Sequence, residues 1–95
     1  MAPGGAAPGG DAKASVKAGM KAKGAGKMEE AAAKFREALQ IDPNSEDANW
    51  GLAWVLAMQG KKPEAATYMK KVVDTTSNAK RKSLGQAALK RLGTG

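Results

Sequence analysis

The chain has 95 residues, a formal net charge of +7, and neither cysteine nor histidine. This length allows one domain with a modest core, and the composition excludes zinc fingers, disulfide scaffolds and thiol or imidazole catalysis. Five lysines against one aspartate in residues 11–27, and five basic residues with no acid in residues 80–95, make both ends basic and favour acidic partners.

The N-terminal part of the chain predicts a flexible tail followed by a weak helix. Residues 1–11 are mostly Gly, Pro and Ala, with little side chain to bury, and we expect them to form the tail. Asp11 is a plausible N-cap for a helix that runs to about Lys23. Helical spacing sets small residues on one side and a lysine stripe on another. The small residues are Ala14, Ala18, Gly19, Ala22 and Ala25, and the stripe is Lys13, Lys17 and Lys21.

A second helix is predicted from Met28 to about Gln40, after a glycine, Gly26, that suits a left-handed turn. Its apolar positions fall mainly on one face, and Glu30 is spaced to pair with Lys34. The apolar positions are Ala31, Phe35, Ala38, Leu39 and Ile41. Proline at position 43 ends this helix, and Asn44 or Ser45 caps the next one.

Three further helices are predicted, and no strand. Residues 46–59 are hydrophobic around most of the helix circumference, so we expect cover on more than one side. Pro63 fits the first turn of a fourth helix that ends near Asp74. A fifth helix spans about 79–92, after a loop and cap at 75–78, and Gly93 closes it. The fourth helix directs Ala65, Tyr68, Met69, Val72 and Val73 inward, and the fifth presents Leu84, Ala87, Ala88, Leu89 and Leu92.

An internal repeat organises these helices. The stretch GKMEEAA at 26–32 returns as GKKPEAA at 60–66, an offset of 34 residues. A fixed period of this length indicates stacked helical hairpins.

The period, the helix alternation and the pattern of small and large residues resemble the tetratricopeptide repeat family over about residues 12–92. The matching positions in the first unit are Gly19, Gly26, Ala31, Phe35, Ala38 and Pro43. Those in the second are Leu52, Ala53, Leu56, Gly60, Ala65, Met69 and Val72. The resemblance implies an all-α, right-handed stack of α-hairpins with about five helices. Repeats would occupy 12–45 and 46–79, with a capping helix at 80–95. Small residues would lie where paired helices cross, and Phe35 and Met69 would fill the space between hairpins.

By the same resemblance, the protein is a non-catalytic scaffold that binds a peptide or protein segment in a concave groove, without metal or cofactor. The groove would be lined by Lys13, Val16, Lys17, Met20, Asp47, Trp50, Gly51, Trp54, Met58, Arg81, Leu84, Gly85 and Ala88. Trp50, Trp54 and Met58 form a stripe at i, i+4 and i+8, with Lys13, Lys17 and Arg81 supplying positive charge. These features suit a partner with large apolar side chains and acidic groups.

Some family members grip a terminal carboxylate with Lys, Asn and Arg side chains. Val16, Met20 and Gly51 occupy positions where such groups are expected here, so chaperone C-terminal tails are not the expected ligands.

Other interpretations remain open from the sequence. The tryptophans can instead pack against the first and fifth helices. The chain can be a basic module that binds nucleic acid or another polyanion through its two charged ends. At the C-terminal end the basic residues are Lys80-Arg81-Lys82 and Lys90-Arg91, although no aromatic residue is interleaved there. It can also be a self-assembling structural subunit whose apolar third helix is covered by another copy.

An enzyme is the least expected class. Gly24-Ala25-Gly26-Lys27 lacks the first glycine, the following Ser or Thr and the preceding strand of a phosphate-binding loop. No base, nucleophile or metal set accompanies the carboxylates. No apolar run approaches the roughly 20 residues of a membrane span, and no signal peptide is visible, so we expect a cytoplasmic location.

Overall fold

The computed structural model describes residues 11–93, which fold into five helices without a strand: α1 (Ala12–Gly24), α2 (Met28–Ile41), α3 (Glu46–Met58), α4 (Lys62–Thr75) and α5 (Ala79–Arg91). The predicted all-α class and all five helices are confirmed. Residues 1–10 of the predicted tail lie outside the described part of the chain.

Side-chain caps begin three of these helices as expected. Asp11 accepts a hydrogen bond from the Lys13 amide at 3.0 Å, and Ser45, rather than Asn44, accepts one from the Ala48 amide at 3.2 Å. Asn78 does the same for α5. Each cap satisfies a backbone donor that the first turn of a helix leaves without a partner.

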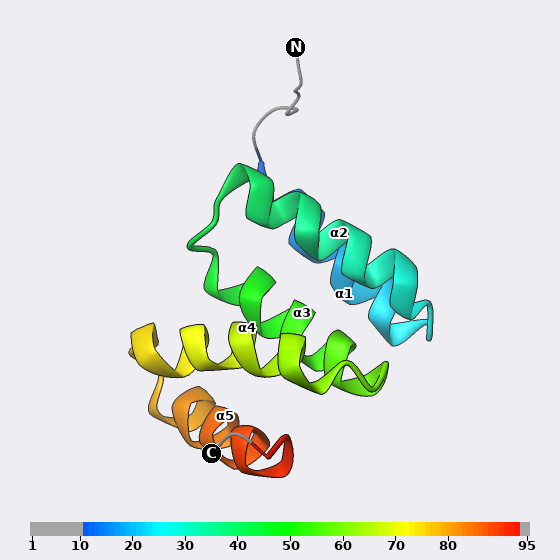
Figure 1. Cartoon of the computed structure of the whole chain (residues 1–95). Coiled ribbons are helices and arrows are strands. Elements are labelled where there is room, and N and C mark those ends of the chain that lie inside the picture. Colours follow the sequence, from blue (N-terminus) through cyan, green and yellow to red (C-terminus); the bar gives the residue numbers. More distant parts are fainter. Residues whose placement is uncertain (1–10, 94–95) are drawn as a thin grey trace.

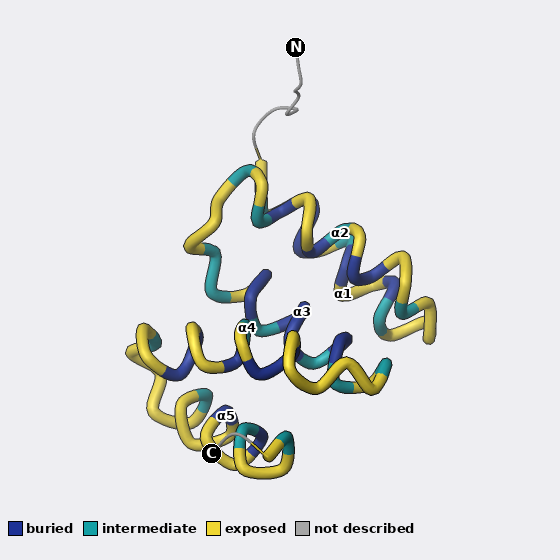
Figure 2. Tube along the Cα trace, in the orientation of Figure 1, coloured by how far each residue is buried: buried dark blue, intermediate teal, exposed yellow. Residues whose placement is uncertain are grey.

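The helices form two hairpins and a fifth helix that covers the second hairpin (Figure 1). α1 packs on α2 and α3 on α4, while α2–α3, α4–α5 and α1–α3 contacts join the layers. Helix α3 is therefore covered on several sides, as its apolar circumference predicted. Buried residues line the inner sides of α2, α3 and α4, and the outward sides are exposed (Figure 2).

The two hairpin turns are alike in detail. Gly26 and Gly60 both have φ of 80°, a conformation that favours glycine. The amide three residues past the last helical residue then donates to a carbonyl of the last turn: Lys27 N to Ala22 O and Lys61 N to Leu56 O, both at 2.9 Å. This pattern closes a helix C-terminus by satisfying its free carbonyls. The two copies of the sequence repeat, at 26–32 and 60–66, therefore begin with turns of the same geometry.

Phe35 of α2 is wedged between α1 and α3. Its side chain is fully buried. A Cβ added at Gly19 would lie 2.8 Å from the Phe35 ring, and one added at Gly51 would lie 2.4 Å from it. Both glycines therefore lack a side chain because the ring occupies that space.

A comparable contact recurs one period later, between α4 and α5. A Cβ added at Gly85 would lie 2.5 Å from Val73 and 3.5 Å from the sulfur of Met69, which is fully buried. Gly51 and Gly85 are separated by the same 34 residues as the two turns. We expected both glycines to line an open groove, but they are buried where α2 and α4 press on α3 and α5.

The buried side of α1 differs from the predicted one. The structure buries Ser15, Val16, Gly19 and Ala22, while Ala14 and Ala25 are exposed. Because most non-lysine residues of this helix are small, hydrophobicity hardly distinguishes its sides. The Ser15 hydroxyl can be buried because it donates a hydrogen bond to Glu37 Oε2 at 2.9 Å.

Polar contacts correct one further expectation on α2. Lys34 lies 3.7 Å from Glu37 in an i, i+3 pair, not beside Glu30. Glu37 is exposed, but it takes part in both this pair and the Ser15 hydrogen bond. It therefore helps to join α1 to α2.

Candidate functional site

The predicted groove residues of α3 lie along one side of that helix. Asp47, Trp50, Trp54 and Met58 follow at spacings of three, four and four residues, which stacks them on one helical face. Each end of this face borders a hollow. The hollows are described in turn because their chemistry differs.

The first hollow lies between α1, the start of α3 and the start of α5, and has a volume of about 430 Å³. The structure brings several predicted site residues together around it. They are Lys13, Val16, Lys17, Met20, Asp47 and Arg81. Val16 is nearly buried, whereas Met20 is 46% exposed and both lysines are exposed. The groups that a partner could reach here are the Met20 side chain and charged side chains of both signs.

The second hollow, of about 280 Å³, lies between the later turns of α3 and α5. Its walls are mostly apolar. The residues that line it are Trp54, Ala57, Met69, Leu84, Ala87, Ala88, Arg91 and Leu92. Sequence reasoning did not assign Ala57, Arg91 and Leu92 to the site. The 34-residue offset relates Leu92 to Met58, which was assigned to the groove, and this signal could have found Leu92; no comparable signal marked Ala57 or Arg91.

The two tryptophans have different surroundings. Their ring centroids are 5.5 Å apart with the planes at 79°, an edge-to-face arrangement. Trp50 is half-buried, lies beside Gly85 and carries the guanidinium of Arg81 5.1 Å from its ring centroid. Trp54 is half-buried too, but it lines the second hollow. The alternative that a tryptophan packs on the fifth helix therefore describes Trp50 better than Trp54.

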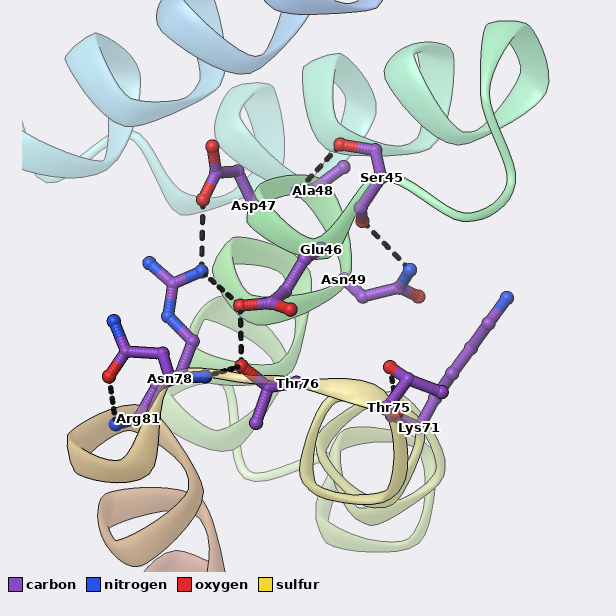
Figure 3. A network of polar contacts seen from close by, with 10 residues as sticks. All are labelled: Ser45, Glu46, Asp47, Ala48, Asn49, Lys71, Thr75, Thr76, Asn78 and Arg81. Atoms are coloured by element: carbon purple, nitrogen blue, oxygen red, sulfur yellow. Dashed lines mark hydrogen bonds and ion pairs between the residues drawn. The ribbon is translucent and has the colours of Figure 1, made fainter.

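Arg81 is half-buried, and two carboxylates at the start of α3 hold its guanidinium (Figure 3). Its Nη1 lies 2.8 Å from Glu46 Oε2 and 3.0 Å from Asp47 Oδ1. The Thr76 hydroxyl donates to the same Glu46 oxygen at 2.8 Å, and the Arg81 amide donates to Asn78 Oδ1 at 2.9 Å. These contacts tie the start of α5 to the start of α3.

The same contacts determine the charge that Arg81 contributes to the site. Burial alone would lower the pKa of Arg81, but its hydrogen bonds to Asp47 and Glu46 outweigh burial, so the pKa is raised. Arg81 stays charged, and two acidic residues of the chain balance that charge. We expected Arg81 to supply positive charge to a partner. Its contacts with Glu46 and Asp47 instead hold the start of α5 against the start of α3.

Replacing Arg81 by glutamine should lower the free energy of unfolding by about 1–2 kcal/mol, because two partly exposed ion pairs and one cation–π contact are lost. The measurement is urea denaturation followed by circular dichroism. Lys82→Gln is the matched control, since Lys82 is exposed and has no ion pair within residues 11–93. Equal midpoints for both variants would show that the network does not hold α5.

Comparison with known proteins gives the family. A sequence model of the tetratricopeptide repeat matches residues 22–92, from the last turn of α1 to the end of α5. The chain belongs to the tetratricopeptide repeat family. A search of curated proteins found no match. Tetratricopeptide repeat domains generally mediate protein–protein interaction and are typically non-catalytic.

In this tetratricopeptide repeat protein, the exposed lysines of α1 form no ion pair with another residue of 11–93. The ion pairs within residues 11–93 involve Lys34, Lys70 and Arg81, and none involves Lys13, Lys17 or Lys21. In α5, Lys90 and Arg91 likewise have no acidic partner in that range. Unpaired positive charge therefore borders both hollows.

Residues 11–93 of this tetratricopeptide repeat protein carry neither a membrane-spanning helix nor a cluster of metal ligands. None of the five helices is long and apolar enough to cross a membrane. No group of three or more acidic residues in that range is placed to bind a metal ion.

Proposed function

We propose that this protein is a non-catalytic scaffold that binds a peptide or protein segment along the face shared by α1, α3 and α5. In this proposal residues 12–45 and 46–79 are the two repeats, and residues 80–95 form the capping helix. The proposal is built on the family's general role in protein–protein interaction and on the surface chemistry of these three helices.

One observation carries the proposal. The exposed large hydrophobic residues of residues 11–93 are Met20, Met58 and Leu84, at 46%, 58% and 50% exposure. One comes from each of α1, α3 and α5, and each lies on the predicted groove face. Met20 and Leu84 border the two hollows, and Met58 continues the tryptophan stripe. Exposed large apolar side chains on the three helices that line these hollows support a binding surface.

The proposed partner has large apolar side chains and acidic groups. Trp54, Met58 and Met20 would make the apolar contacts, while Lys13 and Lys17 would attract carboxylates. Trp50 would support Trp54 through their edge-to-face contact, and Arg81 would hold the fifth helix in place. Recognition of this kind needs no cofactor.

The test is affinity capture from host lysate with the wild type and with Trp54→Ala, each with and without nuclease. We expect at least one protein whose recovery falls roughly tenfold or more in Trp54→Ala, because a tryptophan in an interface is often a binding hot spot. Helical circular dichroism should stay nearly unchanged. Arg36→Ala, on the exposed side of α2, is the control that should bind like the wild type.

Other outcomes would assign the function elsewhere. Equal, nuclease-sensitive capture by all three proteins would indicate instead that the basic residues bind nucleic acid. Loss of helicity in Trp54→Ala would place this residue in the core. A mass in light scattering that falls on dilution would indicate self-assembly.

A further inference from the structure

The hollow between α3 and α5, called here the α3–α5 pocket, has a size and a mostly apolar lining that suit one apolar side chain. Its accessible walls are Trp54, Ala57, Leu84, Ala87 and Leu92, and the charged side chain at its border is Arg91. Leu84 is half exposed and Ala87 is exposed, so apolar surface remains open to water. Filling the pocket with an apolar group would remove that surface from water, which is favourable.

Charge identifies the kind of occupant. Residues 79–93 contain five basic residues and no acid. Glu46 and Asp47 balance Arg81, but no ion pair in residues 11–93 involves Arg91. The dipole of α5 favours basic residues in its last turn, so their presence alone indicates no ligand. What distinguishes Arg91 is that its side chain also borders the apolar pocket.

A second copy of this chain fits the pocket poorly. Face-to-face association would bring two α5 helices with like charges together, which opposes binding. The other exposed large apolar residues of the described chain, Met20 and Met58, lie on the proposed groove face itself. A copy would therefore have to insert a residue of its own groove face.

We propose that the α3–α5 pocket receives a bulky apolar side chain of a partner peptide, and that Arg91 pairs with an acidic residue next to it. This inference rests on the proposed function and adds the place where the partner's apolar and acidic groups bind, the α3–α5 pocket and Arg91. The partner is an acidic segment with an aliphatic or aromatic anchor.

The test uses a displayed library of random short peptides, selected in parallel on the immobilised full chain and on four variants. Peptides selected on the wild type should combine a large apolar residue with a neighbouring Asp or Glu. On Arg91→Gln the apolar preference should remain while the acidic preference is lost. Binding of the acidic peptides should weaken roughly two- to fivefold there, as for a partly exposed ion pair.

Ala87→Glu and Gln86→Glu form a matched pair. Both positions are exposed, and each new carboxylate comes four residues before a basic side chain, Arg91 or Lys90, so both variants should keep α5 helical. Only Ala87 borders the pocket. We expect Ala87→Glu to lose more than tenfold in affinity for the selected peptides, and Gln86→Glu to bind nearly like the wild type.

Failure of this inference is separable from failure of the proposed function. If Trp54→Ala, the fourth variant, loses the peptides but Arg91→Gln keeps their acidic preference, the groove stands and the inference is wrong. Equal binding by Ala87→Glu and Gln86→Glu would also overturn it. If no peptide distinguishes the wild type from Trp54→Ala, both proposals are wrong.

Discussion

Replacing Phe35 by alanine should lower the free energy of unfolding by about 3–5 kcal/mol, the usual cost of removing a buried phenylalanine ring. The ring is fully buried and lies against the backbones of both α1 and α3 at Gly19 and Gly51. Its loss would open a cavity where the two hairpins meet. A chain of this length has a total stability of about 5–14 kcal/mol, so the variant should lose a large part of it.

Urea denaturation followed by helical circular dichroism measures this loss. Phe35→Leu is the matched control, because it refills part of the cavity and should lose clearly less than Phe35→Ala. Leu39→Ala, at a half-buried position of the same helix, should also lose less. A loss below about 1 kcal/mol for Phe35→Ala would contradict the tight packing of the ring between α1 and α3, because this is far below the cost of an unfilled cavity.

Gly51→Ala should destabilise the protein by about 2 kcal/mol, although glycine to alanine in a helix normally stabilises by about 1 kcal/mol. The added Cβ would lie 2.4 Å from Cζ of Phe35. The ring has little room to move toward α1, because even a Cβ added at Gly19 would lie 2.8 Å from it. Overpacking of this kind costs about 1–3 kcal/mol, and a ring held on both sides favours the upper end.

The chain offers a direct control for this prediction. Gly24 closes α1, and a Cβ added there would meet nothing within 4 Å. Gly24→Ala should therefore leave stability unchanged or raise it by up to about 1 kcal/mol. Adding Phe35→Leu to Gly51→Ala should relieve the clash, so the two changes should cost less together than the sum of their separate costs. If Gly51→Ala stabilised the protein as Gly24→Ala does, the close approach of α2 and α3 would be wrong.

The sequence predicted the helices well because their ends carry local chemistry. Capping by Asp11 and Asn78, the left-handed glycines Gly26 and Gly60, and Pro63 act within a few residues of where they stand. Such signals do not depend on the rest of the fold. The side of a helix that is buried does depend on it. In α1 the small side chains gave no strong preference, and packing on α2 decided the outcome.

The site was harder to predict because its decisive contacts are long-range. Arg81 meets Glu46 and Asp47, which are 35 and 34 residues away in the chain, so no local pattern showed that its charge is balanced. The sequence predicted that Gly51 and Gly85 line an open groove, whereas in the structure the Phe35 ring and Val73 pack against them. The exposed Leu84 and the pocket beside Arg91 depend on how α5 meets α3.

The most direct test of the proposed binding face is chemical-shift mapping of the ¹⁵N-labelled protein with a peptide selected on it. We predict that the indole N–H signal of Trp54 and amide signals along α1, α3 and α5 shift together. Amides on the exposed sides of α2 and α4, such as those of Arg36 and Thr67, should stay in place. Shifts confined to α2 and α4, with the Trp54 signal unmoved, would contradict a partner bound on the α1, α3 and α5 face.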